Sequence, residues 1–131
     1  METILVIDDD DLFLRTLETV LRRAGYRVLA APGGREGIEL FRAHRPALVI
    51  TDIRMPGKDG FEVIEELRQE CPDVRTIAVS GGDPTGVDLL KRALAIGASD
   101  FIAKPINPFN LVARVRRCLG PAAEEGVPPA A

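Results

Sequence analysis

The chain has 131 residues, of which 46% are hydrophobic and 28% are charged, and its formal net charge is −3. These proportions are typical of one globular domain, and the acidic balance argues against a nucleic-acid-binding surface. No apolar run approaches the roughly 20 residues that a membrane-spanning helix needs, so we expect no membrane insertion. The opening METILVIDDDD becomes acidic too early for a secretory signal, and two isolated cysteines fit a cytoplasmic protein.

Five short apolar segments alternate with segments of helical period along the chain. The first segment, 3–8, is followed by apolar residues at Phe13, Leu17, Val20, Leu21 and Ala24, which share one face of a helix. The later strand and helix pairs are expected at 26–31 with 38–41, 47–51 with 63–71, 74–80 with 87–94, and 100–104 with 109–119. Five strand-then-helix units predict a parallel sheet with helices on both faces.

Polar side chains end four of these strands. The first strand ends in four aspartates beginning at Asp8, the third in Asp52, the fourth in Ser80 and the fifth in Lys104. The carboxyl ends of parallel strands form the ligand-binding edge of such a sheet. If the first and third strands are neighbours, their carboxylates converge and need a cation, and a set of oxygen ligands suits Mg²⁺. A hydroxyl and an ammonium group nearby suit a phosphoryl group, and an aspartate can accept one.

Each of these groups has an ordinary structural explanation when it is considered alone. Asp10 or Asp11, before an apolar helix, fits an N-cap. Ser80, before two glycines, fits a turn, and Asp59 and Gly60 fit a turn and a helix start. The functional hypothesis therefore depends on four strands that carry suitable groups at one edge.

Four motifs occur in a set order along the chain: ILVIDDDD, DIRMPGKDG, AVSGG and FIAKP. Together they resemble the motifs of the receiver domain of two-component response regulators. The resemblance implies an α/β fold, a flavodoxin-like, doubly wound five-stranded parallel sheet of order 2-1-3-4-5 with five helices. It places a receiver domain at 2–120, and the composition of 121–131 predicts a flexible tail or linker.

The resemblance also implies roles for the acidic residues. Asp52 is expected to be the phosphorylated nucleophile. Mg²⁺ is expected to bind Asp9, Asp52 and the backbone carbonyl of Arg54, with Asp8 acting mostly through water. Beyond accepting and losing this phosphoryl group, no enzymatic turnover is implied.

The other motif residues are expected to bind the phosphoryl group and to relay its presence. Ser80, Gly81 and Lys104 are the expected phosphoryl-binding residues. Ser80 and Phe101 are the expected switch residues, and the resemblance implies a cis peptide bond before Pro105. Phe101 lacks the hydroxyl of a tyrosine, which excludes any state that depends on that hydroxyl.

The resemblance implies protein partners on both sides of the switch. The expected donor is a sensor histidine kinase or a histidine phosphotransfer protein. The expected output is a downstream protein or an output domain absent from this chain, with no direct binding to nucleic acid. Its contact surface is expected on the fourth helix, fifth strand and fifth helix, where apolar residues such as Leu89 and Ile96 accompany Arg114, Arg116 and Arg117.

Three alternatives remain open at this point. Asp8 and Asp10 imitate the Asp-x-Asp of haloacid-dehalogenase-type phosphatases, but Leu12 is unusual there and no late acidic pair follows. A flavodoxin-like binding module would need a hydroxyl- and glycine-rich loop where this chain has four aspartates. A degenerate receiver that only docks would not need the intact acidic, hydroxyl and lysine groups.

Overall fold

Five strands and five helices alternate in the computed structural model, which describes residues 2–81 and 86–120. The strands are β1 (Thr3–Ile7), β2 (Arg27–Ala31), β3 (Leu48–Asp52), β4 (Thr76–Ser80) and β5 (Asp100–Ala103). The helices are α1 (Asp11–Arg23), α2 (Gly34–His44), α3 (Gly60–Glu70), α4 (Gly86–Ala95) and α5 (Pro108–Leu119). The sequence GGDPTG at 81–86 predicts a loop, and residues 82–85 of it and the expected tail at 121–131 lie outside the described residues.

All strand pairs are parallel, and the order is β2-β1-β3-β4-β5. The predicted fold class and strand order are therefore confirmed. β1 and β3 are neighbours, with Ile7 paired to Thr51, so the residues that follow them meet at the carboxyl edge. At the same carboxyl edge, on the side of β4 and β5, the N–H of Lys104 donates to the carbonyl of Ser80 at 2.7 Å. This hydrogen bond brings the end of β5 close to the end of β4.

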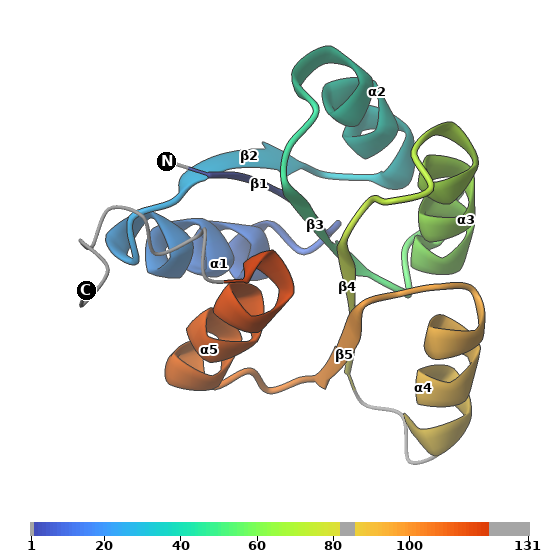
Figure 1. The fold of residues 1–131 in the computed structure, drawn as a ribbon. Helices are drawn as coiled ribbons and strands as arrows, with labels where there is room; N and C mark the ends of the chain where they lie inside the picture. The colour runs from blue at the N-terminus through green and yellow to red at the C-terminus, as the bar shows by residue number, and fades with distance from the viewer. Residues whose placement is uncertain (1, 82–85, 121–131) are drawn as a thin grey trace.

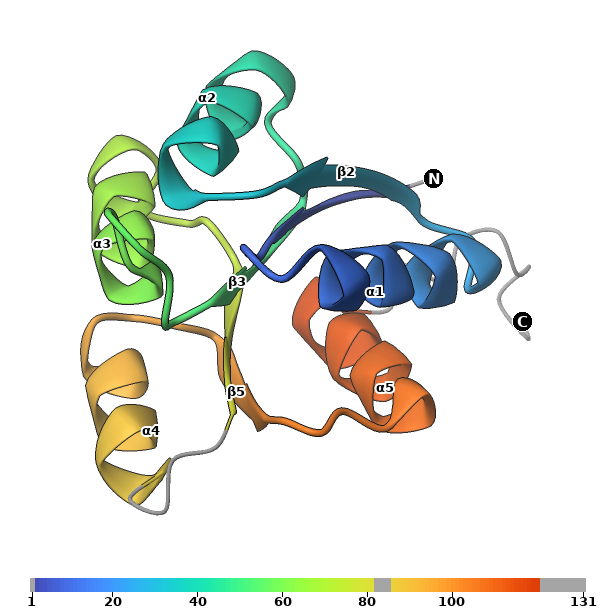
Figure 2. The ribbon, with the colours of Figure 1, turned by 180° about the vertical axis from the view of Figure 1, so that it is seen from behind.

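The helices form a layer on each side of the sheet. α1 and α5 cover one face, and α2, α3 and α4 cover the other (Figure 1 and Figure 2). Alternate residues of β1 face the two helical layers. Ile4 and Val6 pack with α1 and α5, and Leu5 and Ile7 pack with α2 and α3. Because both faces are covered, the strands are nearly continuous apolar runs, as expected for a parallel sheet.

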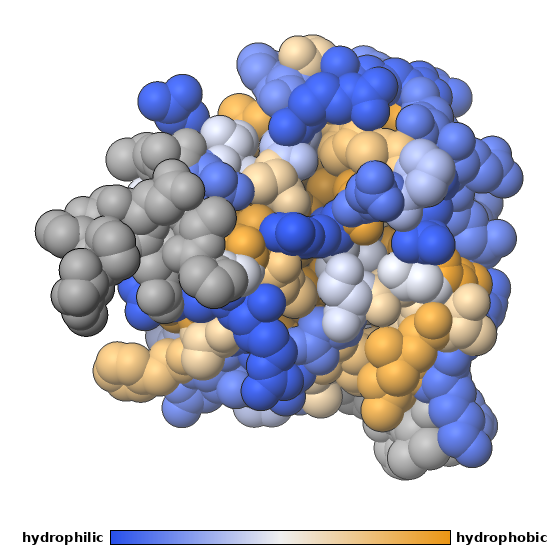
Figure 3. Space-filling view, in the orientation of Figure 1, coloured by the Kyte–Doolittle hydropathy of each residue, from blue (hydrophilic) through white to orange (hydrophobic). Residues whose placement is uncertain are grey.

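The helical phase of α4 differs from the prediction. The spacing of Val87, Leu90, Ala93 and Leu94 predicts that these residues share the packed face, whereas Leu89 and Ile96 are expected on the contact surface. Ala93 is fully buried, as predicted. In the structure Leu90 and Leu94 are 36% and 50% exposed, whereas Leu89 and Ile96 are partly buried against the cluster that contains Ala93. Figure 3 shows apolar atoms on the surface over α4. The prediction was wrong for the two leucines, because two apolar stripes that lie about one residue apart in phase both satisfy helical spacing.

The first helix follows its pattern more closely. Leu14, Leu17 and Leu21 are its buried residues, and Phe13 and Val20 pack partly against the same core cluster. Asp10 precedes the helix and accepts hydrogen bonds from the N–H groups of Leu12 and Phe13, which confirms an N-cap there. Within the described ranges, no helix combines the length and the apolar character needed to cross a bilayer.

Candidate functional site

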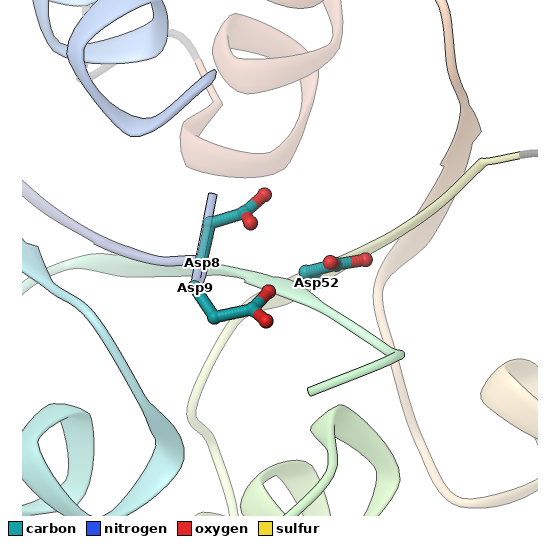
Figure 4. Close-up of side chains that lie close together, drawn as sticks. All are labelled: Asp8, Asp9 and Asp52. Atoms are coloured by element: carbon teal, nitrogen blue, oxygen red, sulfur yellow. The ribbon is translucent and has the colours of Figure 1, made fainter. Parts of the chain in front are cut away.

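Three carboxylates converge at the carboxyl edge of the sheet. Asp8 and Asp9 follow β1, and Asp52 ends β3. One oxygen from each of the three lies within 4.8 Å of the other two. Figure 4 shows Asp8 and Asp9 extending from the end of β1 toward the side on which Asp52 lies. Asp8 and Asp52 are only 1% and 7% exposed, whereas Asp9 is exposed, so the cluster is open to solvent on one side.

The buried carboxylates lie in an environment that disfavours their charge. Burial raises the pKa of Asp8, although the N–H of Asp10 and the ammonium of Lys104 act in the opposite direction. Burial also raises the pKa of Asp52, and the nearby charge of Asp8 raises it further. Backbone hydrogen bonds from Ile53 and Arg54 lower the pKa of Asp52, but less than burial raises it. A site of this kind favours a bound cation over free charges.

Lys104 is a basic residue that faces these carboxylates. Its Nζ lies 3.3 Å from Asp8 Oδ2 and 3.7 Å from Asp52 Oδ2. The peptide bond that joins it to Pro105 is cis, the geometry that the resemblance implies. A Cβ atom added to Gly81 would lie 2.9 Å from Lys104 Cδ, so glycine leaves the space that the lysine side chain occupies.

The ring of Phe13 is a further neighbour of this lysine. Its centroid lies 4.0 Å from Lys104 Nζ, within the range of a cation–π interaction. The sequence assigned Phe13 to the packed face of α1 and gave it no role at the site. Its position four residues after Asp9, in the first turn of the helix that leaves the acidic edge, was the available signal.

Ser80 lies at the end of β4, next to β3, since its neighbour Val79 pairs with Asp52. Ser80 is 4% exposed, and its hydroxyl has no hydrogen-bond partner among residues 2–81 and 86–120. A buried hydroxyl without a partner is uncommon and costly in a folded protein. The hydroxyl is therefore available to a ligand oxygen at the same edge as Asp52.

The chain turns away sharply after Asp52. The N–H of Ile53 donates to Val79 at 2.9 Å, and α3 begins at Gly60 with a capping box formed by Asp59 and Glu62. A Cβ atom on Gly60 would lie 2.2 Å from the carbonyl oxygen of Asp52, so this close approach requires glycine. The start of α3 therefore packs directly against the backbone of Asp52.

The model of the response regulator receiver domain family matches residues 4–116. The chain belongs to this family. Its acidic pocket is the one formed by Asp8, Asp9 and Asp52. The receiver domain spans about half the length of the curated relatives that it matches, since it covers 44% of one and 52% of another.

These relatives are named as transcriptional regulators. The probable transcriptional regulator ycf27 of Galdieria sulphuraria is 42% identical over 116 residues, which are 88% of this chain and 44% of the relative. The transcriptional regulatory protein AfsQ1 of Streptomyces coelicolor is 37% identical over 119 residues, which are 91% of this chain and 52% of the relative.

Solved receiver structures share the fold over nearly their whole length. A putative response regulator from Chloroflexus aurantiacus is 34% identical, with a TM-score of 0.83 over 90% of this chain and 97% of the other. A CheY-like receiver domain protein from Methanospirillum hungatei is 28% identical, with a TM-score of 0.85 over 96% of this chain and 99% of the other.

The acidic pocket of this receiver fits a divalent cation. Its ligand atoms are carboxylate oxygens, which are the donors that Mg²⁺ prefers, and the exposed side at Asp9 leaves room for the waters that Mg²⁺ retains. Burial has already disfavoured the charges of Asp8 and Asp52, and a cation would relieve that penalty. The residues present therefore match the metal that the family resemblance implies.

Proposed function

We propose that this receiver is a phosphorylation-operated signalling switch in which Asp52 accepts a phosphoryl group in a Mg²⁺-dependent reaction. The observation that carries the proposal is the convergence of Asp8, Asp9, Asp52 and Lys104 at one edge, beside the unpartnered hydroxyl of Ser80. The donor is a sensor histidine kinase or a histidine phosphotransfer protein. The receiver turns over no external substrate and loses the group by hydrolysis.

The transfer itself uses a carboxylate oxygen of Asp52 as the nucleophile. That oxygen forms a bond to phosphorus while the bond from phosphorus to the donor histidine nitrogen breaks, and the donor imidazole keeps the bonding electron pair. The chemistry that Mg²⁺ supplies when bound is neutralisation of the charge on the carboxylates and the phosphoryl oxygens. Asp9, Asp52 and the carbonyl of Arg54 hold the ion, and Asp8 acts mostly through water.

The remaining edge residues bind the transferred group. Lys104 interacts with a phosphoryl oxygen through its ammonium, which already lies 3.7 Å from Asp52. Ser80 donates its hydroxyl, and Gly81 donates its backbone N–H. The phosphoryl group carries three strong acceptor oxygens and a charge of about −1.5 to −2. It therefore gives the buried hydroxyl of Ser80 a partner and offers Lys104 a further one beside Asp8 and Asp52.

The phosphorylated state is read on the surface formed by α4, β5 and α5. Phe101 of β5 is half-buried beside the cluster that contains Ala78 and Ala93, and Ser80 ends the neighbouring strand β4. Movement of Ser80 toward the phosphoryl group would open space for the ring of Phe101. Arg114 of α5 donates to the carbonyl of Phe101 at 3.4 Å and pairs with Asp100 at 2.7 Å, so a change in β5 reaches α5.

The domain boundaries and the output belong to the same proposal. The receiver domain occupies residues 2–120. The output is a downstream protein or an output domain outside this chain, which fits relatives that are about twice as long. The receiver itself does not bind nucleic acid, and it works in the cytoplasm.

A labelling experiment tests the nucleophile. Incubation with acetyl phosphate and Mg²⁺ should add one base-labile phosphate per chain, detected by intact mass and mapped to Asp52. Asp52→Asn should abolish the label, whereas Asp10→Asn, which changes only the cap of α1, should retain it. A full label on the Asp52→Asn variant at another aspartate would overturn the assignment. Turnover of a phosphate monoester would instead favour the phosphatase alternative.

A further inference from the structure

We infer that Phe13 is a positioning residue for phosphoryl transfer, because its ring face holds the ammonium of Lys104 toward Asp8 and Asp52. The inference rests on the proposed function, since it concerns the same site. It assigns a role to a side chain that carries no charge and makes no hydrogen bond.

The position of Phe13 is fixed by the start of α1. The Asp10 carboxylate accepts hydrogen bonds from the N–H groups of Leu12 at 3.1 Å and Phe13 at 3.2 Å. The N–H of Asp10 in turn donates to Asp8 Oδ1 at 2.9 Å. This chain of contacts ties the first turn of the helix to the acidic pocket. The ring of Phe13 therefore keeps a defined position relative to Asp8.

The ammonium of Lys104 lies between three attractive neighbours. Asp8 Oδ2 is at 3.3 Å, Asp52 Oδ2 is at 3.7 Å, and the centroid of the Phe13 ring is at 4.0 Å. Charge-assisted hydrogen bonds are normally about 2.7–2.9 Å long, so neither carboxylate alone holds the nitrogen tightly. The ring supplies the third contact, and it fixes the side from which the ammonium faces the carboxylates.

The rest of the lysine is already constrained by β4. Its backbone N–H donates to Ser80 at 2.7 Å, and its side-chain carbons lie against Gly81. The side chain remains 23% exposed, so its flexible end would otherwise be able to turn toward water. A free lysine side chain gains rotamer entropy in that direction, and the attraction of the ring opposes this gain.

An aromatic ring is well suited to this task for a chemical reason. An ammonium group has three N–H donors. A phenyl ring attracts the positive charge of the ammonium but, unlike a carboxylate oxygen, does not accept a strong hydrogen bond from these donors. Donors directed at the pocket therefore remain available for a phosphoryl oxygen. An additional carboxylate at this position would neutralise the charge that the phosphoryl group needs.

Phe13 also packs partly against the core cluster that contains Leu14, Leu17 and Leu21, so a packing role must be separated from a positioning role. Phe13→Leu keeps the apolar packing but removes the ring face, and Phe13→Tyr keeps the ring face. Leu12→Ala is a matched control, because Leu12 lies in the same helical turn and is 75% exposed.

The first experiment measures the rate of phosphorylation by acetyl phosphate with Mg²⁺. We expect Phe13→Leu to slow it by about threefold to tenfold, the range of a partly desolvated cation–π contact. Phe13→Tyr should stay within about twofold of the unsubstituted protein, and Leu12→Ala should not change the rate. In a Lys104→Ala background, Phe13→Leu should have no further effect, because the partner of the ring is absent.

Equal rates for Phe13→Leu and the unsubstituted protein would overturn the inference. A loss of the same size in the Lys104→Ala background would also overturn it, because the ring would then act through packing. A protein that accepts no phosphate at all would refute the proposed function and the positioning role with it. A labelled protein with an unaffected Phe13→Leu variant would refute the positioning role alone.

The second experiment uses NMR and needs no phosphoryl donor. Methylene protons of Lys104 above a ring face are shifted upfield by the ring current, and the shift should be present in the unphosphorylated protein. It should persist in Phe13→Tyr and disappear in Phe13→Leu. An unshifted lysine in the unsubstituted protein would show that the contact does not persist in solution and would overturn the inference.

Discussion

The ammonium nitrogen of Lys104 lies 3.3 Å from a carboxylate oxygen of Asp8, across a separation of 96 residues in the sequence. Asp8 follows β1 and Lys104 follows β5, and these strands are separated in the sheet by β3 and β4. The contact therefore spans the carboxyl edge and holds a positive charge over buried carboxylates. Its energetic role depends on whether a metal ion shares the pocket.

Removal of the lysine charge should destabilise the metal-free protein. Lys104→Met keeps most of the side-chain bulk but removes the ammonium that lies beside the carboxylates of Asp8 and Asp52. We expect the free energy of unfolding at neutral pH to fall by about 1–2 kcal/mol, below the usual value for a buried pair because Lys104 is 23% exposed. Mg²⁺ should restore much of this loss. Urea unfolding with and without Mg²⁺ is the measurement.

Lys58→Met is the matched control for that experiment. Lys58 also forms an ion pair, but its partner is Glu66 and not a carboxylate of the acidic cluster, and its side chain is 33% exposed. Its removal should change the free energy of unfolding by less than about 1 kcal/mol. A loss independent of Mg²⁺ in both variants would contradict the explanation by carboxylate repulsion.

The adjacent aspartates after β1 should have separable roles. Asp9→Ala removes an exposed carboxylate of the cluster, so Mg²⁺ affinity should fall at least about tenfold while stability changes little. Asp10→Ala removes the N-cap of α1, so it should lower the free energy of unfolding by about 1 kcal/mol and leave Mg²⁺ affinity nearly unchanged. Mg²⁺ titration and urea unfolding of both variants are the measurements. Equal losses of Mg²⁺ affinity would mean that the register of the aspartates is wrong.

The candidate site was largely predictable because four strands carry polar groups at their carboxyl ends. Asp8, Asp52 and Lys104 converge because the strands are parallel and follow the order β2-β1-β3-β4-β5. Their convergence therefore depends on the topology of the sheet and only weakly on side-chain packing. The contact of Phe13 with Lys104 was not predictable, since an aromatic residue at helical spacing normally indicates core. It depends on the angle at which α1 leaves the sheet, which apolar spacing does not specify.

The phase of α4 shows a second limit of the sequence. Its apolar residues form two stripes, one through Leu90 and Leu94 and another through Leu89 and Ala93. Both stripes satisfy helical spacing, so spacing cannot distinguish between them. The structure selects the stripe of Ala93, because a small residue lets the helix approach β4 and β5, and it leaves two leucines exposed.

The stability of the metal-free protein should depend on pH through Asp52. Burial and Asp8 raise the pKa of Asp52 above its ordinary value of 3.8. A carboxyl whose pKa is raised in the folded state favours folding below its unfolded pKa, and this contribution disappears as pH rises through the folded pKa. Above its raised pKa the wild-type carboxyl is charged, and the protein carries the penalty of that buried charge. Asp52→Asn carries no such penalty.

We therefore expect Asp52→Asn to be more stable than the wild-type protein at neutral pH without metal. The difference should shrink as pH falls through the raised pKa of Asp52 toward 3.8, because the wild-type carboxyl becomes neutral there. Mg²⁺ at neutral pH should reduce the difference by stabilising the wild-type protein. Urea unfolding across this pH range is the measurement. A difference that stays constant with pH would exclude titration of Asp52 as its cause.

The switch should depend on the ring of Phe101. This ring is half-buried beside the cluster that contains Ala78 and Ala93, and it lies on the strand next to that of Ser80. The backbone carbonyl of Phe101 accepts a hydrogen bond from Arg114 of α5. A phosphoryl mimic such as beryllofluoride with Mg²⁺ should therefore shift backbone NMR signals in residues 81–119 more than in residues 26–45. Phe101→Ala should reduce the shifts in α4 and α5 severalfold while Asp52 still accepts phosphate.

The control for Phe101→Ala is Phe109→Ala. Phe109 is 86% exposed at the start of α5, so loss of its ring changes the surface without altering the packing between β4, β5 and α4. The shifts induced by the mimic should survive in this variant. If the mimic perturbs only the residues around the acidic cluster in the unsubstituted protein, the signal does not travel through β5. If Phe101→Ala leaves the shifts intact, the ring is an ordinary core residue and Ser80 must act on α4 by another route.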